Sequence, residues 1–393
     1  MPWPVGPTDP SVAAHLTEAL RRALDGSGPA IAPFAIGALS GAPSATSVLP
    51  RTVAPDVCLV VRTSGSSGGA RGVLLGRDAI MASVEATHTR LGGPGRWVVA
   101  LPLAHVAGLQ VLIRSIVAGT EPVVVEAQRF TPEALAAAAD AADGAQRLYT
   151  SLVPTQLHRV VAAGSGGSLP PELAGLRRFD AVLVGGAATS STLLTAARAL
   201  GLAVVTTYGM TETCGGCVYD GVPLDGVRVA LDDGVVRIAG PVLAHGYLPG
   251  PGPDPFTTDQ GGVRWLTTRD LGELADGRLR VVGRRDDTVI TGGQKVDPAA
   301  VEDVLAGVRG VGQVCVVGVA DDEWGQSLTA VVVADATGPP ALAHLRDAAS
   351  RTLGSASAPR RLVLVAALPE RGPGKVDRAA VAAMAAVAAR STD

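Results

Sequence analysis

Short apolar runs alternate with longer Ala- and Leu-rich stretches through the first half of the chain. The runs contain many β-branched residues and are bounded by Gly, Pro or polar residues, which is typical of strands; they lie at residues 57–62, 97–103, 122–126, 181–184 and 203–207. The stretches between them, such as residues 132–142 and 190–200, favour helix because Ala and Leu have high helix propensity. This alternation predicts an α/β protein with layered, mostly parallel sheets.

After about residue 221 the pattern changes to short strands separated by tight turns. Strands are expected at residues 227–230, 235–239 and 278–282, with turns at Asp232-Asp233-Gly234 and Asp276-Gly277. Asp-Gly pairs between apolar runs are a strong hairpin signal. We therefore expect a β-rich subdomain at the end of a large N-terminal domain. The charged stretch at residues 283–287 has the composition of a linker.

A second α/β rhythm begins beyond this linker. Asp297 is a favourable N-cap and Pro298 suits the first position of a helix, and apolar residues then recur on one helical face at Val301, Val304, Leu305 and Val308. Strands at residues 314–319, 329–333 and 362–365, a helix at 341–353 and a final Ala-rich helix complete the pattern. These elements predict a large N-terminal domain at residues 1–284 and a small, mobile α+β C-terminal domain at 285–393.

Composition and charge exclude several classes of protein. The 393 residues are 47% hydrophobic and 18% charged, which fits a globular protein with a sizeable core. The net charge of −3, from 33 basic and 36 acidic residues, gives no basic excess for binding nucleic acid or an anionic membrane. There is no signal-peptide pattern and no apolar stretch of the length that a membrane span needs, so the expected location is the cytoplasm.

The spacing of Cys214 and Cys217 matches a redox motif or half of a zinc site. A structural zinc site needs about four ligands, and the sequence has no second CxxC and no paired histidines. We therefore interpret the four cysteines as ordinary thiols.

The segment after the strand at 57–62 is rich in glycine and hydroxyl residues. It holds four glycines and four hydroxyl residues in eleven positions and reads Thr63-Ser64-Gly65-Ser66-Ser67-Gly68-Gly69-Ala70-Arg71-Gly72-Val73. Glycine allows the backbone to approach an anion closely, and consecutive N–H groups can surround phosphate oxygens while Arg71 adds a positive charge. The segment lacks the lysine pattern of a Walker A loop. A Gly/Ser surface loop is the alternative, and motifs downstream decide between them.

Those motifs follow in order: Tyr208-Gly209-Met210-Thr211-Glu212, Thr268-Arg269-Asp270-Leu271-Gly272-Glu273, Gly283-Arg284-Arg285-Asp286-Asp287 and Gly374-Lys375. Together with residues 63–73 they resemble the acyl-adenylate-forming superfamily, which includes acyl- and aryl-CoA synthetases, adenylation domains of peptide synthetases and beetle luciferases. The resemblance covers roughly residues 55–380. It implies an enzyme that uses ATP and Mg²⁺ to activate a carboxylic acid and then transfers the acyl group to coenzyme A.

The resemblance also implies roles for single residues around ATP. Residues 63–73 would hold the β- and γ-phosphates, and Gly185-Gly186-Ala187-Ala188 would lie along the adenine and the acyl pocket. Tyr208 would stack on adenine, Thr211 would contact the α-phosphate and Glu212 would hold Mg²⁺. A hard carboxylate oxygen is a suitable ligand for that ion.

Further roles fall near the C-terminus of the larger domain and beyond it. Asp270 would accept hydrogen bonds from the ribose hydroxyls, with Arg284 nearby. Lys375 would bridge the attacking carboxylate and the α-phosphate during adenylation. Rotation of the C-terminal domain about a hinge at Asp286 would then withdraw Lys375 and admit coenzyme A.

The acyl pocket is less well defined. Residues 102–108 resemble a family motif in which His105 gates the pocket, and His158 lies on a helix that often borders it; a structural or packing role remains open for each histidine. The short, Ala- and Gly-rich chain and residues 151–161 resemble the actinobacterial o-succinylbenzoate–CoA ligases of menaquinone biosynthesis, which is the preferred subgroup. The alternatives are another aryl- or acyl-CoA synthetase, an adenylation enzyme that loads a carrier protein, and an inactive homologue. A homodimer is left open.

The sequence departs from the family pattern at two places. Arg71 stands where lysine is usual, which keeps the charge but changes the geometry of the cation. The lysine motif reads Arg371-Gly372-Pro373-Gly374-Lys375 rather than the usual Ser-Gly-Lys. Both departures keep the chemistry and could alter its rate.

Overall fold

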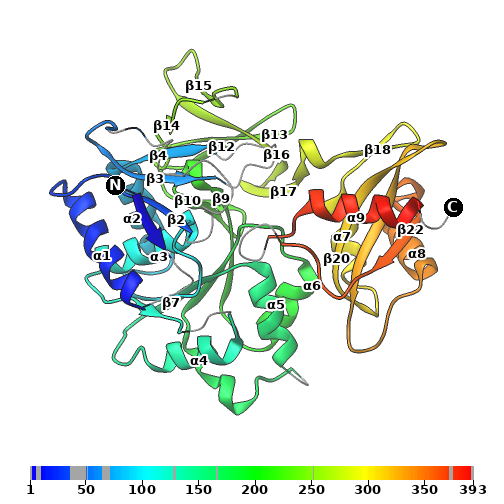
Figure 1. Cartoon of the computed structure of the whole chain (residues 1–393), viewed down its shortest axis with the longest axis horizontal. Coiled ribbons are helices and arrows are strands. Elements are labelled where there is room, and N and C mark those ends of the chain that lie inside the picture. Colours follow the sequence, from blue (N-terminus) through cyan, green and yellow to red (C-terminus); the bar gives the residue numbers. More distant parts are fainter. Residues whose placement is uncertain are drawn as a thin grey trace.

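The computed structural model describes residues 2–5, 10–35, 50, 52–63, 71–126, 130–164, 167–250, 252–370 and 375–390. A seven-stranded sheet in the order β11-β10-β9-β8-β7-β5-β6 forms the centre of the larger part of the molecule (Figure 1). Its parallel strands are β5 (Arg96–Val99), β6 (Val123–Val124), β7 (Leu148–Leu152), β8 (Ala181–Val184) and β9 (Val204–Met210). The antiparallel strands β10 (Gly215–Tyr219) and β11 (Val222–Pro223) extend it at one edge. The predicted α/β layering is therefore confirmed.

Both faces of this sheet are buried. Along β8, Ala181 and Leu183 belong to one apolar core while Val182 and Val184 belong to another. Side chains alternate between the faces of a strand, so a strand buried on both sides needs apolar residues at every position. This requirement explains the uninterrupted apolar runs in the sequence.

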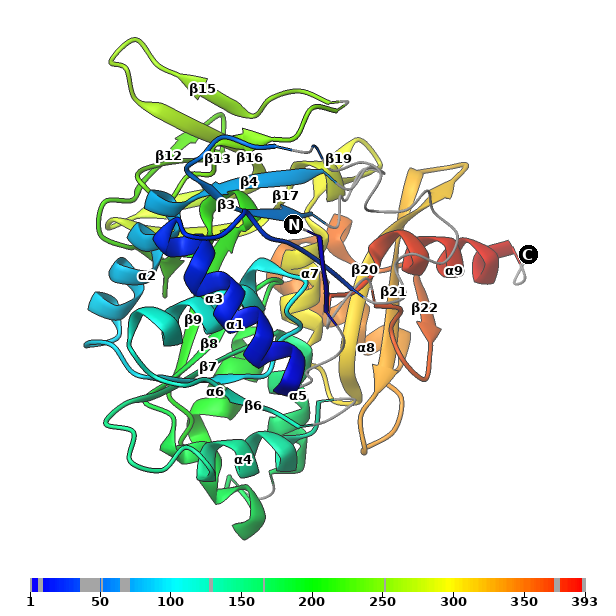
Figure 2. The same cartoon turned by 60° about the vertical axis from the view of Figure 1, so that its left-hand side comes forward.

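Helices contribute apolar side chains to the cores on both faces of this sheet. The helices of this part are α1 (Pro10–Asp25), α2 (Arg77–Arg90), α3 (Val106–Val117), α4 (Pro132–Asp140), α5 (Pro154–Ala163) and α6 (Ser191–Ala199), with a 3₁₀ helix at Pro171–Arg178. Helix α1 packs against α3 (Figure 2). Helices α4 and α6 begin where the sequence predicts, because the Thr131 and Ser190 side chains accept hydrogen bonds from backbone N–H groups of the first turn.

Two antiparallel sheets complete the larger part, and a parallel pair, β1 (Pro2–Val5) and β2 (Ala32–Ala35), lies near the N-terminus. One sheet joins β3 (Val57–Arg62), β4 (Gly72–Gly76) and β14 (Gly246–Tyr247). The other contains β12 (Arg228–Asp232), β13 (Val235–Ala239), β15 (Phe256–Thr258), β16 (Arg264–Ala275) and β17 (Arg278–Arg284). The predicted hairpins are confirmed: Asp233-Gly234 and Asp276-Gly277 all have positive φ, as two-residue hairpin turns require.

Two details of this region differ from expectation. Residues 268–273 were not predicted as a strand but lie inside β16, whose Gly, Thr and charged residues hide the strand pattern. The segment at 283–287 is not an open linker, because Gly283 and Arg284 finish β17 and a 3₁₀ helix occupies Arg285–Asp287 (η3).

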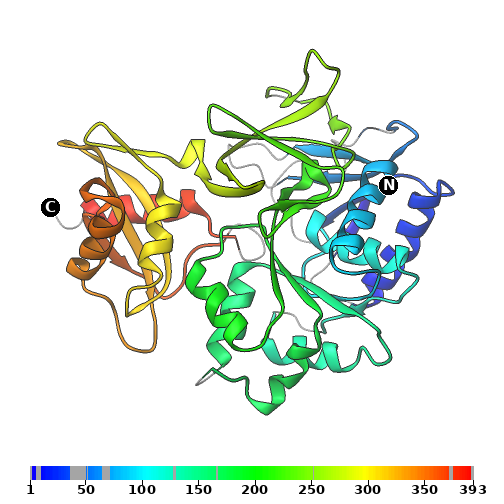
Figure 3. The ribbon, with the colours of Figure 1, turned by 180° about the vertical axis from the view of Figure 1, so that it is seen from behind.

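The C-terminal part has its own sheet and its own cores. Its strands are β18 (Val289–Thr291), β19 (Gln294–Val296), β20 (Val311–Asp321), β21 (Gly325–Ala334) and β22 (Arg361–Leu364); its helices are α7 (Pro298–Leu305), α8 (Leu342–Leu353) and α9 (Arg378–Arg390), with a 3₁₀ turn at Ser355–Ser357. The apolar clusters on its sheet contain only residues beyond 288. Seen from behind, this part lies beside the larger one at one end of the molecule (Figure 3). The expected small α+β unit is present.

Helices of the described ranges are all too short or too polar to cross a membrane.

Candidate active site

The predicted phosphate loop runs between β3 and β4. Its middle, which includes Ser64, Gly65, Ser66, Ser67 and Gly68, lies outside the described residues. Its two ends are joined: Thr63 N donates to Arg71 O at 2.9 Å, and Arg71 N donates to Thr63 Oγ1 at 3.3 Å. The loop therefore leaves and re-enters the sheet at one point.

Arg71 lies against β14 at the returning end of the loop. Its guanidinium carbon is 3.5 Å from the centre of the Tyr247 ring, and its Nη1 donates to Pro253 O at 3.0 Å. Tyr247 is held there because it pairs with Val73 across β4 and β14. A planar guanidinium stacks on an aromatic face in a way that a lysine ammonium does not, so this contact suits the arginine that replaces the usual lysine.

Tyr208, near the end of β9, contacts Asp270 of β16, which pairs with Arg284 of β17. The Tyr208 hydroxyl donates to Asp270 Oδ2 at 2.8 Å, and Arg284 Nε lies 3.6 Å from Asp270 Oδ1. Asp270 and Arg284 are register partners on the two strands. Burial is the main cause that raises the pKa of Asp270, while the Tyr208 hydrogen bond and the Arg284 charge oppose it. The structure thus brings Tyr208 to Asp270, 62 positions away in the sequence, and to its hairpin partner Arg284.

Glu212 follows β9 on a short 3₁₀ helix, Thr211–Thr213. Its backbone is fixed, because Ala244 N donates to Glu212 O at 2.8 Å. The Tyr247 hydroxyl donates to Glu212 Oε1 at 2.6 Å. Tyr247 cannot be identified from the sequence, because no local motif shows that β14 returns beside both Glu212 and the end of the phosphate loop.

Close backbone approaches explain two of the glycines that the motifs contain. A Cβ on Gly209 would overlap Gly215 O on the neighbouring strand, and one on Gly185 would overlap the Thr207 side chain. Gly186 has φ of +84°, a conformation that glycine adopts without strain. Ala187 next to it is exposed. Gly185 and Gly186 therefore present backbone without side chains at the turn after β8.

Lys375 reaches this turn from the C-terminal part. A Cβ built on Gly186 would lie 3.2 Å from Lys375 Cε and 3.9 Å from its Nζ. The residue as a whole is exposed, yet the protein surrounds its ammonium sufficiently for burial to lower its pKa. The Arg284 charge lowers the pKa further and the Glu212 charge opposes it. Lys375, Arg284 and Glu212 are therefore close enough to interact electrostatically.

The two predicted pocket histidines lie on different helices. His105 is the residue before α3; burial and then the Lys375 charge lower its pKa. His158 is half-buried on α5, where burial and then the charge of Arg159 lower its pKa. His105 therefore belongs to the surroundings of Lys375, whereas a pocket role for His158 stays a prediction.

Polar contacts connect the two parts of the chain. Arg269 Nη1 of β16 lies 2.8 Å from Asp286 Oδ2 of the 3₁₀ helix η3. Asp303 Oδ1 of α7 accepts hydrogen bonds from Ser191 N at 3.0 Å and Ser191 Oγ at 3.3 Å, at the first turn of α6. These contacts are made in the same arrangement that places Lys375 beside Gly186.

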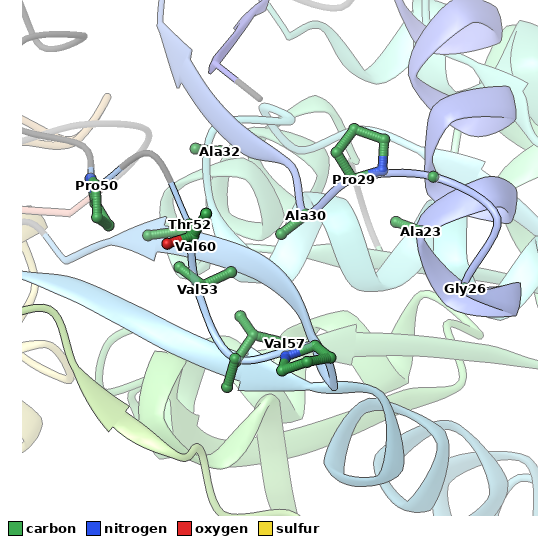
Figure 4. A pocket seen from close by; sticks show the side chains of 13 residues that line it. Ala23, Gly26, Pro29, Ala30, Ala32, Pro50, Thr52, Val53, Val57 and Val60 are labelled. Atoms are coloured by element: carbon green, nitrogen blue, oxygen red, sulfur yellow. The ribbon is translucent and has the colours of Figure 1, made fainter.

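Other features are not among the predicted site residues. Cys214 and Cys217 are fully buried, and burial raises the pKa of the Cys217 thiol to about 12. No group of three potential metal ligands occurs within the described ranges. A pocket beside β3 is lined mainly by small apolar residues such as Ala30, Val53 and Val57, and none of the predicted site residues lines it (Figure 4).

Comparisons with known proteins identify the family of the chain. The model of the AMP-binding enzyme family matches residues 14–248, and that of the AMP-binding enzyme C-terminal domain matches residues 300–375. A probable 2-succinylbenzoate–CoA ligase of Mycobacterium tuberculosis is 44% identical over 378 residues, which cover 94% of this chain and 95% of that protein. The 2-succinylbenzoate–CoA ligase of Enterococcus faecalis is 28% identical over 347 residues, which cover 82% of this chain and 68% of that protein. A similar solved structure is o-succinylbenzoate coenzyme A synthetase (MenE) from Bacillus subtilis in complex with AMP. It is 25% identical, has a TM-score of 0.70, and the match covers 89% of this chain and 74% of that chain.

Proposed function

Because the chain belongs to the AMP-binding enzyme family, we propose that it is an AMP-forming acid–CoA ligase whose acid is 2-succinylbenzoate. The observation that carries the reaction class is the position of Lys375, which the C-terminal part delivers beside Gly186 and within the electrostatic reach of Glu212. The acid rests on the Mycobacterium tuberculosis relative, which is 44% identical over nearly the whole of both chains.

The donor groups at the site fit ATP with Mg²⁺. Among the described residues, the Tyr247 hydroxyl is the partner of Glu212 Oε1, which leaves Glu212 Oε2 for a cation. A bound Mg²⁺ would neutralise charge on the phosphates. In nucleotide sites this ion is usually held by one or two carboxylates together with phosphate oxygens, so a single glutamate beside a phosphate loop is a suitable donor set.

We also assign residues to the phosphates, the adenine and the ribose of ATP. In this proposal residues 63–73 hold the β- and γ-phosphates, Tyr208 and residues 185–188 border adenine, and Asp270 binds the ribose hydroxyls. The Tyr208–Asp270 hydrogen bond and the Arg284 contact support the last assignment, because they hold the carboxylate in one orientation. A hydrogen bond to an ionised group contributes about 1.5–3 kcal/mol when it is made in a protected site.

The first half-reaction forms the acyl-adenylate. A carboxylate oxygen of the acid attacks the α-phosphorus of ATP, and the bond to pyrophosphate breaks. Lys375 bridges the carboxylate and the α-phosphate, Thr211 contacts the same phosphate, and Arg71 adds positive charge near the loop. Preorganised positive groups of this kind stabilise the charge that develops in the transition state.

The second half-reaction forms the thioester. The sulfur of coenzyme A attacks the acyl carbonyl carbon, its proton passes to solvent, and AMP leaves with the electron pair of the broken bond. We propose that residues 285–393 act as a mobile domain on residues 1–284 and turn about Asp286, which withdraws Lys375 for this step. The separate apolar cores on the two sides of that boundary support this division.

The acyl pocket is proposed to lie between α3 and α5. His105 would border the reacting carboxylate, since it lies near enough to Lys375 for the lysine charge to lower its pKa. His158 on α5 would border the more distant end of the acid.

The test is ATP–pyrophosphate exchange over a panel of aromatic and aliphatic acids that includes 2-succinylbenzoate. We expect exchange with 2-succinylbenzoate at a kcat/KM well above that of every other acid, followed by thioester formation when coenzyme A is added. Exchange with aliphatic acids alone would exclude the proposed substrate. Acyl transfer to a phosphopantetheinyl carrier protein, with none to coenzyme A, would exclude the proposed acceptor.

A further inference from the structure

We infer that Tyr247 is a positioning residue that fixes the Glu212 carboxylate for its cation and ties that carboxylate to the returning end of the phosphate loop. This inference rests on the proposed function, in which Glu212 holds Mg²⁺. It adds a residue that none of the motifs contains.

The hydrogen bond between these two side chains is short. The Tyr247 hydroxyl donates to Glu212 Oε1 at 2.6 Å, a length typical of an O–H donor to an ionised carboxylate. The carboxylate can only accept, so the phenol O–H is the donor of this bond. One carboxylate oxygen is thereby held, and the other is oriented by the same bond.

Both the backbone and the ring of Tyr247 are held by neighbouring residues. It pairs with Val73 across β4 and β14, and Leu248 N donates to Gly72 O at 2.7 Å. The Arg71 guanidinium covers one face of the ring at 3.5 Å, and the Phe256 ring centre lies 6.0 Å from that of Tyr247. A side chain that is packed in this way loses little further freedom when it holds a partner in place.

The arrangement links two halves of a site that the chain builds from separate segments. Arg71 ends the loop that would hold the β- and γ-phosphates, and Glu212 would hold the cation that these phosphates share. Tyr247 contacts both Arg71 and Glu212, so one ring connects the end of the loop with the carboxylate. Groups that orient a metal ligand in this manner typically change metal affinity or activity about 10–100-fold when they are removed.

The test compares three single variants in the full-length protein. Tyr247→Phe keeps the ring and its stack on Arg71 and removes only the hydroxyl. Glu212→Gln removes the proposed metal ligand. Tyr149→Phe is the matched control, because it removes a hydroxyl that donates to the carbonyls of Leu91 and Gly93 instead.

The readout is binding of Mn²⁺, followed by electron paramagnetic resonance in the presence of a non-hydrolysable ATP analogue. We expect Tyr247→Phe to raise the Kd for Mn²⁺ about tenfold, Glu212→Gln to raise it more, and Tyr149→Phe to leave it unchanged. In turnover, Tyr247→Phe should raise the Mg²⁺ concentration for half-maximal rate, while kcat at saturating Mg²⁺ is largely kept. A merely structural defect would lower the rate at every Mg²⁺ concentration.

The outcomes separate the two proposals. If Glu212→Gln weakens Mn²⁺ binding and Tyr247→Phe does not, the positioning role is wrong while the proposed function stands. If neither variant weakens it, Glu212 is not the metal ligand, and that part of the proposed function fails together with the inference. Equal weakening by Tyr149→Phe would also overturn the positioning role, because the effect would then be general.

Discussion

The contact between Asp303 and Ser191 predicts how the two half-reactions respond to a single substitution. Asp303 Oδ1 accepts from Ser191 N and Ser191 Oγ, at 3.0 Å and 3.3 Å, and so caps the first turn of α6 from the C-terminal part. Both residues are exposed, so we take the contact as worth about 1 kcal/mol, below the range for buried hydrogen bonds to a charge. Asp303→Ala should therefore lower the ratio of docked to undocked enzyme about fivefold.

The assay measures each half-reaction alone. Pyrophosphate release in a single turnover reports adenylation, and thioester formation from added acyl-adenylate reports the second step. We expect Asp303→Ala to lower the first rate relative to the second by up to about fivefold, with Asp347→Ala, an exposed aspartate of α8, as the control. An unchanged ratio of the two rates in Asp303→Ala would show that this contact does not hold the adenylation arrangement.

Two further predictions concern stability. His88 is buried, and burial, followed by the Arg114 charge, lowers its pKa from 6.5 to about 4. The folded state therefore resists protonation of His88. Stability that is present above pH 6.5 should be lost as the pH falls toward 4, and the loss should be about 2 kcal/mol at pH 5. Urea unfolding at pH 7 and pH 5 checks this, and an equally steep loss in His88→Gln would contradict it. Gly209→Ala should destabilise the protein by about 3 kcal/mol, because its Cβ overlaps Gly215 O; a Tm as high as that of Gly250→Ala, where a Cβ meets only Leu248 O at 3.9 Å, would show that the strands yield easily.

Much of the fold could be predicted because its strands are buried on both faces. The run at 57–62 matches β3 and that at 181–184 matches β8, since a short, uninterrupted apolar run bounded by turn residues favours a buried strand. Strand β16 was missed because residues 264–275 mix glycine, threonine and charge, and their pairing with β13 and β17 decides their conformation. Helices α1, α2 and α3 were also not among the predicted elements, although α2 and α3 pack against the central sheet and α1 packs on α3.

The site shows the same division between local and distant information. Ordered motifs identified the family, which the comparisons confirm, and they named Asp270 and Arg284, which the structure places on paired strands. Motifs could not show that Tyr208 donates to Asp270, because that contact joins residues 62 positions apart. Tyr247 could not be found at all, since its role follows from the pairing of β14 with β4. Local sequence identifies groups with chemistry, whereas the sheet pairings decide which of them meet.

The central claim is that a lysine from the C-terminal part serves adenylation and is withdrawn for thioester formation. The most direct measurement is the rate of each half-reaction in Lys375→Ala, with 2-succinylbenzoate and ATP for the first step and the preformed acyl-adenylate and coenzyme A for the second. We expect adenylation to fall by about 10²–10³-fold, while thioester formation from the adenylate is kept. Equal losses in both half-reactions would show that Lys375 is not withdrawn for the second step.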